Sequence, residues 1–328
     1  MDRRVFLATA GIAAGHSLVA PRLSMAQGTY PNRPVRLIIP FAPGGQTDIL
    51  GRRFAQKLEA ACGQTVVPEN KGGAGGTIGS LEVVRAAPDG YTLEIGTSST
   101  HSISPFIMAK QPYDPVKDFT SIALLGIIPM VIVVHPSVPA KNLKELIALV
   151  KANPNKYAYG SAGVGSINHL TGEMFKTQAG GLDLPHVPYK GSGASVQDLI
   201  GGQIPVLMAT FSSVESAHKA GRVRILAVTV EKRLAIAPDI PTAIESGLPD
   251  MVSYTFNALF GPPAMPAAIV KYLGDQSHKI MSDVAFQKDL QGLAIDPVTD
   301  STPESTTKFV RDQVDRFAPI IKASGIQV

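Results

Sequence analysis

Short apolar runs alternate with amphipathic stretches along most of the chain. Residues 35–39 form a continuous apolar run, as in a strand that is covered on both faces. The next stretch, 47–62, carries apolar residues four positions apart and ends before Gly63, which is typical of an amphipathic helix with a glycine stop. The strand-then-helix unit recurs at 65–68 and 77–87, 91–95 and 102–110, 157–160 and 166–177, 186–189 and 194–200, and 205–210 and 212–220. This alternation predicts an α/β fold.

Two segments predict a division into two lobes. The apolar run 119–135 is too long for one typical strand and contains Gly126 and Pro129, so we expect two strands joined through a bend. A second series of strand-helix units follows it, and the chain returns through a second crossing near 251–258. The expected lobes are residues 27–128 with 254–328, and residues 129–253.

Three helical stretches finish the chain, at 266–281, 284–293 and 303–323. Thr302 is a capping residue for the last of them, and proline occupies its first helical position. These stretches extend the first lobe.

Five of the strand-to-helix junctions are loops of Gly, Ser and Thr. They span 42–48, 72–76, 96–101, 160–166 and 189–193. A helix N-terminus presents unpaired backbone N–H groups, and the peptide dipoles there favour negative charge. Because the loops carry no nucleophile and no metal-ligand cluster, they indicate a site that holds a carboxylate without reacting with it. The candidate residues on them are Gly44, Gly45, Thr47, Asp48, Gly75, Gly76, Ser98, Ser99, His101, Ser161, Ala162, Ser166 and Lys190.

Several candidates have a structural as well as a functional interpretation. Asp48 would repel an anion, and it fits a helix cap, an acceptor for a bound water, a partner for a ligand amino group or part of a tight turn. Lys190 fits a contact to a distal carboxylate or a solvated loop position. His101 and His169 lie just inside loop-to-helix junctions, where a role in the site competes with a structural one. Phe256, in the second crossing, fits an aromatic wall for the ligand or core packing.

The motifs of common enzymes do not fit this sequence. Gly73, Gly75 and Gly79 are spaced G-x-G-x-x-x-G, which departs from the dinucleotide fingerprint. The chain also lacks a P-loop lysine pair and the G-x-S-x-G of a secreted hydrolase, which is the weakest alternative. The six histidines that follow the leader form no H-x-H or H-x-x-x-H pair. We therefore expect no catalysis, no metal and no cofactor.

The first 26 residues predict an export signal. A charged start precedes a mildly apolar stretch, and Ser24-Met25-Ala26 is a small-x-small cleavage signal, so we expect cleavage before Gln27. Arg3-Arg4-Val5-Phe6-Leu7 fits the core of a twin-arginine signal, with ordinary secretion as the alternative. The leader predicts a periplasmic protein.

Charge and cysteine content exclude further classes. The net charge is +4, and removing a leader with three Arg and one Asp leaves +2. Because no basic stripe is interleaved with aromatic residues, we expect no nucleic-acid partner. Cys62 is the single cysteine, so it cannot form an internal disulfide, and it fits a small buried hydrophobic residue.

An ordered set of motifs resembles a known family along essentially the whole mature chain. The motifs are YPNRPVRLIIPF at 30–41, PGGQTD at 43–48, ENKGGAGG at 69–76, GSAG at 160–163, HLTGE at 169–173, VPYKG at 187–191 and QDLIGGQ at 197–203. The set resembles the Bug or TctC family, the solute-binding proteins of tripartite tricarboxylate transporters. The resemblance implies a two-lobed, type II-like periplasmic binding fold with a central cleft and no catalysis.

The resemblance also implies roles for individual residues. Loops 44–48 and 75–76 would hold one ligand carboxylate through backbone N–H groups and bridging waters. The second lobe would contact the rest of the ligand through Ser161, Ala162, Ser166 and Thr210. Family members commonly carry Trp at the position of Phe256 and often Asp near Thr210, so the distal pocket would suit a different or more apolar ligand.

The implied ligand is a small carboxylate, either a dicarboxylate or an aromatic acid. The implied partners are the membrane subunits of the transporter, with a membrane receptor that senses the ligand as the alternative. We expect a monomer.

Overall fold

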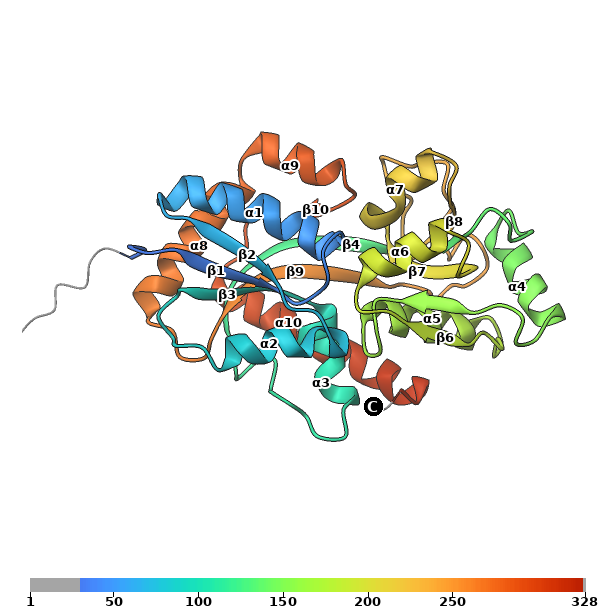
Figure 1. The fold of residues 1–328 in the computed structure, drawn as a ribbon, viewed down its shortest axis with the longest axis horizontal. Coiled ribbons are helices and arrows are strands. Elements are labelled where there is room, and N and C mark those ends of the chain that lie inside the picture. Colours follow the sequence, from blue (N-terminus) through green and yellow to red (C-terminus); the bar gives the residue numbers. More distant parts are fainter. Residues whose placement is uncertain (1–29, 327–328) are drawn as a thin grey trace, which may run out of the picture.

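The computed structural model describes residues 30–326, which form two lobes joined by long strands (Figure 1). The predicted leader, residues 1–26, lies outside this range. The strands are β1 (Val35–Ile39), β2 (Val66–Asn70), β3 (Thr92–Thr97), β4 (Thr120–Val134), β5 (Tyr159–Ser161), β6 (His186–Pro188), β7 (Val206–Thr210), β8 (Arg224–Val228), β9 (Tyr254–Gly261) and β10 (Asp296–Pro297). They join in the order β2-β1-β3-β9-β4-β7-β5-β6, and β8 and β10 also pair with β4. The arrangement confirms the predicted α/β class with two lobes and two crossing segments.

Lobe 1 surrounds the parallel strands β1, β2 and β3. Its helical segments are α1 (Gln46–Cys62), η1 (Ala74–Gly76), α2 (Thr77–Val84), η2 (Ser99–Ile103), α3 (Ser104–Ile107), α8 (Ala267–Met281), α9 (Val284–Gln291) and α10 (Pro303–Ser324). Leu37 belongs to a core cluster shared with α1, α8 and α9, whereas its neighbour Ile38 belongs to a cluster shared with α2 and α10. Because successive strand residues point to opposite faces, β1 is apolar on both sides and reads as a continuous hydrophobic run.

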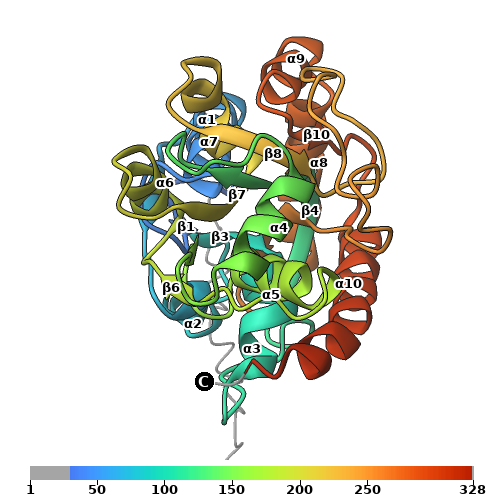
Figure 2. The same ribbon diagram turned by 90° about the vertical axis from the view of Figure 1, so that its right-hand side faces the viewer.

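Lobe 2 surrounds β5, β6, β7 and β8, and Figure 2 shows it from its outer end. Its helices are α4 (Leu143–Ala152), α5 (Ile167–Gln178), α6 (Ser192–Ile200) and α7 (Phe211–Lys219). Residues of α4 and α5 share one core cluster, and residues of α6 and α7 share another. The sheet of this lobe is therefore covered on both faces, like that of lobe 1.

The first crossing is one continuous strand, and the prediction of two strands joined by a bend in this segment is wrong. β4 runs for 15 residues, pairing with β9 through Pro129 and with β7 from Met130 onward. Its register shifts twice against β9 and once against β8. Such irregularities bend and twist a strand without ending it. They let β4 pass from one lobe into the other.

Helix α10 contacts both lobes. Thr302 and Ser305 form a capping box at its start, with Pro303 in the first helical position, as the sequence predicts. Val310 packs in a lobe 1 cluster, whereas Phe317 and others near the C-terminal end join the cluster of α4 and α5. The predicted boundaries assign this helix to lobe 1, and its last turns lie against lobe 2.

Candidate functional site

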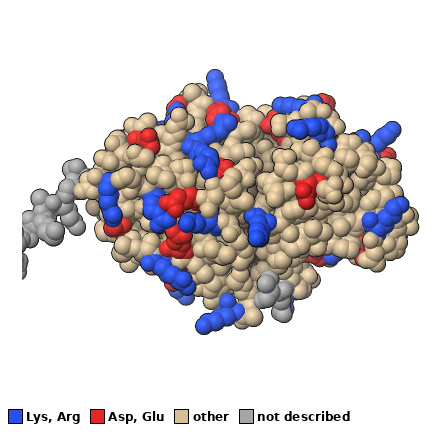
Figure 3. Space-filling model, in the orientation of Figure 1, with Lys and Arg blue, Asp and Glu red and all other residues tan. Residues whose placement is uncertain are grey.

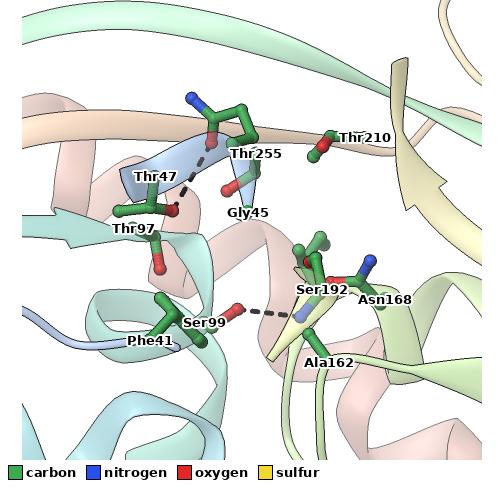
Figure 4. A pocket seen from close by; sticks show the side chains of 12 residues that line it. Phe41, Gly45, Thr47, Thr97, Ser99, Ala162, Asn168, Ser192, Thr210 and Thr255 are labelled. Carbon is green, nitrogen blue, oxygen red and sulfur yellow. Dashed lines mark hydrogen bonds between the residues drawn. The ribbon is translucent and has the colours of Figure 1, made fainter. Parts of the chain in front are cut away.

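Several helical segments begin at the boundary between the lobes. Lobe 1 contributes the first residues of α1 and η2, and lobe 2 contributes the first residues of α5 and α6 and the N-cap residue of α7. A cavity of about 30 Å³ lies between them (Figure 4). Its walls are formed by Phe41, Gly45, Gln46, Thr47, Thr97, Ser99, Ala162, Ile167, Asn168, Ser192, Thr210 and Thr255. Both lobes therefore contribute residues to the walls of one cavity.

The loop between β1 and α1 places Gly45 and Thr47 at the cavity. Gly44 has a φ of 84°, a backbone conformation that favours glycine, and it turns the chain into the helix. Asp48 is buried in the first turn of α1, where its carboxylate accepts hydrogen bonds from the backbone N–H of Gly44 (3.0 Å), from Arg52 Nε (2.8 Å) and from the side-chain amide of Asn70 (2.9 Å). Asp48 thus braces the loop, and the Arg52 guanidinium balances its charge.

The end of β3 places Ser98 and Ser99 at the boundary between the lobes. The hydroxyl of Ser98 accepts a hydrogen bond from the backbone N–H of Phe256 (3.3 Å), which fastens the second crossing to β3. Ser99 lines the cavity, and its hydroxyl accepts a hydrogen bond from the backbone N–H of Ile167 at the start of α5 (2.9 Å, Figure 4). The two lobes are therefore hydrogen-bonded to each other beside the cavity.

His101 is not among the residues that line the cavity. Its ring is fully buried and stacks on Phe260, with ring centroids 3.8 Å apart, and its Nδ1 lies 2.8 Å from the hydroxyl of Thr100. Burial lowers the pKa of His101 to about 3 because desolvation penalises the charged imidazolium. His101 is therefore neutral at neutral pH and packs against the core of lobe 1.

The loop after β5 positions Ser161, Ala162 and Ser166. Ala162 lines the cavity, whereas the hydroxyl of Ser161 is turned toward His186, 2.6 Å from its Nε2. Ser166 is the N-cap of α5, where its hydroxyl accepts a hydrogen bond from the backbone N–H of His169 (3.2 Å). The side chains of Ser161 and Ser166 therefore stabilise the loop that carries Ala162 to the cavity.

His169 and His186 form a stacked pair behind this loop. Their ring centroids are 3.8 Å apart and the rings are nearly parallel, at 8°. Burial lowers the pKa of His169 to about 4 and that of His186 to about 3, so both imidazoles are neutral at neutral pH. His169 Nδ1 accepts a hydrogen bond from the backbone N–H of Gly165 (3.3 Å), which stabilises the loop 160–166.

The remaining candidates lie in different places. Thr210 lines the cavity as the N-cap residue of α7. Gly75 and Gly76 have φ values of 63° and 99° and are not among the residues that line the cavity, and Gly75 lies close to the lobe 2 backbone at Val164 and Gly165. Lys190 is exposed. Phe256 is fully buried and packs edge-on against Phe309, 5.2 Å between centroids, in the core of lobe 1.

The cavity also includes residues that sequence reasoning did not select. They are Phe41, Gln46, Thr97, Ile167, Asn168, Ser192 and Thr255. Gln46 lies inside the selected loop 42–48, between Gly45 and Thr47, so selecting every residue of that loop would have included it. Asn168 lies two residues beyond the selected loop 160–166, so extending that loop by two residues would have reached it. Thr255 precedes Phe256 on β9, and alternation along a strand places the two side chains on opposite faces.

The lining of the cavity is uncharged. None of the twelve residues that line it in the described part of the chain is a Lys, Arg, His, Asp or Glu. A bound anion would therefore be met by backbone N–H groups at helix starts, by hydroxyls and by side-chain amides. The cavity hydroxyls also have no histidine or carboxylate beside them in the lining to act as a general base, so the arrangement is suited to holding a ligand.

The surface of the molecule carries charges of both signs. On the face drawn in Figure 3, Lys and Arg side chains are interspersed with Asp and Glu. Between residues 30 and 326, no group of three or more His, Cys, Asp or Glu side chains is placed to hold a metal ion. No helix within that range is both long enough and apolar enough to cross a membrane.

Comparisons with known proteins place this geometry in a family. Residues 50–326 match the model of the tripartite tricarboxylate transporter family receptor, TctC. Protein BugT of Bordetella pertussis is 33% identical over 99% of this chain and 96% of its own length. A structure of an R. palustris protein with adipate is 30% identical, with a TM-score of 0.88 over 91% of this chain and 99% of that one. MatC from Rhodopseudomonas palustris with bound malate is 29% identical, with a TM-score of 0.85 over 89% of this chain and all of that one.

Proposed function

This chain belongs to the tripartite tricarboxylate transporter receptor (TctC) family, and on that premise we propose that it captures a small aliphatic dicarboxylate in the cleft between its lobes. It binds the ligand without changing it, acts in the periplasm after removal of residues 1–26, and delivers the ligand to the membrane subunits of its transporter. We take it to act as a monomer, with lobes at residues 27–128 plus 254–328 and at 129–253.

The observation that supports this proposal is the uncharged cavity bordered by helix N-termini from both lobes. Each helix start carries about half a positive charge and stabilises a nearby anion by roughly 0.3–1 kcal/mol, and by up to about 2 kcal/mol in a partly buried setting. The starts of α1 in lobe 1 and of α5, α6 and α7 in lobe 2 lie on different sides of the cavity. A ligand with a carboxylate at each end can use both sets at once, which a monocarboxylate cannot.

Relatives support the ligand class. Two structures of the same fold, each about 30% identical to this chain, contain malate and adipate, which are both aliphatic dicarboxylates. The lining of this cavity contains hydroxyls and amides for carboxylate oxygens, and Phe41 and Ile167 for a short carbon chain.

Isothermal titration with the purified mature protein tests the proposal. The panel contains malate, adipate, their monocarboxylate counterparts, an aromatic acid, a sugar and an amine. We expect a dicarboxylate to bind at least tenfold more tightly than the matching monocarboxylate, which corresponds to about 1.4 kcal/mol. Binding of the sugar or the amine with no response to any acid would contradict the proposal.

A pair of isosteric variants connects the binding to this cavity. Thr255→Val removes a hydroxyl from the lining, and Thr306→Val removes one that is fully buried in α10, away from the cavity. We expect Thr255→Val to weaken dicarboxylate binding several-fold and Thr306→Val to leave it unchanged. Equal effects of the two variants would place the ligand elsewhere.

A further inference from the structure

Ser104 connects the two lobes at a point outside the cavity. It is the first residue of α3, it is fully buried, and it is absent from the cavity lining. Its hydroxyl lies 3.1 Å from the carbonyl oxygen of Gly75 in lobe 1 and 3.0 Å from the carbonyl oxygen of Gly165 in lobe 2. A serine hydroxyl has one proton, so it can donate fully to only one of these two oxygens at a time.

The two glycines allow this close approach. Gly75 and Gly165 have φ values of 63° and 78°, in the region that favours glycine. A Cβ on Gly75 would lie 2.4 Å from Ser104 Oγ, and a Cβ on Gly165 would lie 2.4 Å from the side chain of Ile107. There is no room at this joint for a side chain between the lobes, and therefore the carbonyl of Gly165 reaches the Ser104 hydroxyl directly.

The segment around Ser104 is the lobe 1 surface that faces α5. Ser99, five residues earlier, accepts the hydrogen bond from Ile167 of lobe 2, and Ile103 and Ile107 join the core cluster that contains the lobe 2 residues of α4 and α5. Residues 99–107 thus combine apolar contacts with two cross-lobe hydrogen bonds. Ser104 forms one of these two hydrogen bonds.

We propose that Ser104 is a positioning residue for closure, whose hydroxyl donates to Gly75 when the lobes are apart and to Gly165 when they are closed. This rests on the proposed function as a receptor that closes around its ligand. In the open conformation the Gly75 carbonyl keeps the hydroxyl partnered, since both belong to lobe 1. In the closed conformation the Ser104 hydroxyl donates to the Gly165 carbonyl oxygen, which closure has removed from water. The Gly75 carbonyl oxygen stays close to the Ser104 hydroxyl. The Ser104 hydroxyl thus stabilises the closed conformation by partnering the Gly165 carbonyl. It also keeps an acceptor, the Gly75 carbonyl, when the lobes open.

The test compares Ser104→Ala with a matched control, Ser277→Ala. Ser277 is also fully buried and its hydroxyl also donates to a backbone carbonyl, that of Leu273 (2.8 Å), but both residues lie within α8 of lobe 1. Small-angle scattering of the ligand-free proteins measures closure without any ligand. We expect a larger radius of gyration for Ser104→Ala than for wild type, and no change for Ser277→Ala.

Ligand release provides a second measurement. With malate or adipate, whichever wild type binds, stopped-flow displacement should show Ser104→Ala releasing the ligand about three- to tenfold faster, with a nearly unchanged association rate. If Ser104→Ala does not fold, as judged by its melting curve, Ser104→Cys retains a weak donor and should show the same changes in smaller measure. The proposal would be overturned if Ser104→Ala had the same radius of gyration and the same ligand release rate as wild type. If neither acid binds wild type, the proposed ligand is wrong, and the scattering comparison still decides the role of Ser104.

Discussion

Gly193 provides a direct test of whether this closed arrangement is the ligand-binding conformation. It is the second residue of α6, at the edge of lobe 2, and its backbone touches the loop of lobe 1. A Cβ at this position would lie 2.3 Å from the carbonyl oxygen of Pro43 and 3.6 Å from the carbonyl carbon of Gly44. Both are backbone atoms of the other lobe, so no side-chain rotation can relieve the contact.

The size of the effect follows from that distance. Real Cβ atoms essentially never approach another heavy atom within 3.0 Å, so Gly193→Ala requires the lobes to separate by at least about 0.7 Å at this edge. Separation there weakens the contacts that a ligand makes to both lobes, and we expect a ten- to hundredfold loss of affinity, about 1.4–2.7 kcal/mol. Alanine is the better helix former by up to about 1 kcal/mol, so the free energy of unfolding should stay the same or rise.

The assay measures both quantities on each variant, by calorimetric titration with malate or adipate, whichever wild type binds, and by urea unfolding. Gly201→Ala is the control, because Gly201 ends the same helix and its Cβ would meet only lobe 2 atoms, the nearest at 3.4 Å. We expect this control to bind like wild type. Wild-type affinity in Gly193→Ala would refute the reasoning, since the ligand would then be held in an arrangement where Gly193 and Pro43 are apart.

Three further substitutions test the buried groups around the site. Asp48→Ala removes the acceptor of the backbone N–H of Gly44, and we expect urea unfolding to show a loss of about 1–3 kcal/mol together with weaker ligand binding. His101 has a pKa lowered to about 3, so the unfolded chain takes up a proton first as pH falls below about 6.5. His101 should then contribute a loss of stability of about 1.4 kcal/mol for each pH unit down to about pH 3. His169 and His186 contribute losses of the same sign, so His101→Asn should reduce the slope without abolishing it. Burial raises the pKa of Glu94 to about 8, so the unfolded chain loses its proton first as pH rises above about 4.5, and stability is lost up to pH 8. Glu94→Gln keeps an acceptor for Ser80 and should match wild type at pH 4.5 and exceed it at pH 7.5; equal stability at both pH values would contradict the expectation.

Periodicity along the chain was enough to predict most strands and helices. The apolar run of β1 and the fourfold spacing in α1 are strong local signals, and the structure contains both elements near the predicted limits. The convergence of the loops could also be predicted, because the carboxyl ends of parallel strands meet at the same edge of a sheet. β4 was misread because a strand that serves two lobes is longer than a typical strand, and because Gly126 and Pro129 within it are residues that usually mark a bend.

The orientation of individual side chains could not be predicted in the same way. Phe256 and Thr255 are neighbours on β9, and only the fold decides that Thr255 faces the cavity while Phe256 enters the core. His169 and His186 are 17 positions apart, so their stacking depends on how β6 lies beside β5. Sequence spacing indicates where a loop lies, whereas the direction of each side chain depends on contacts between distant elements.

The uncharged lining provides a physical reason for coupling binding to closure. A ligand that binds the open and closed conformations equally well does not shift the equilibrium between them, however tightly it binds. An arginine in one lobe would hold a carboxylate in the open conformation nearly as well as in the closed one. Here the donors are weak, and they are divided between α1 and η2 in lobe 1 and α5, α6 and α7 in lobe 2. On the proposed function, a dicarboxylate meets the complete set only when the cleft is closed, so most of its binding free energy goes into favouring the closed conformation.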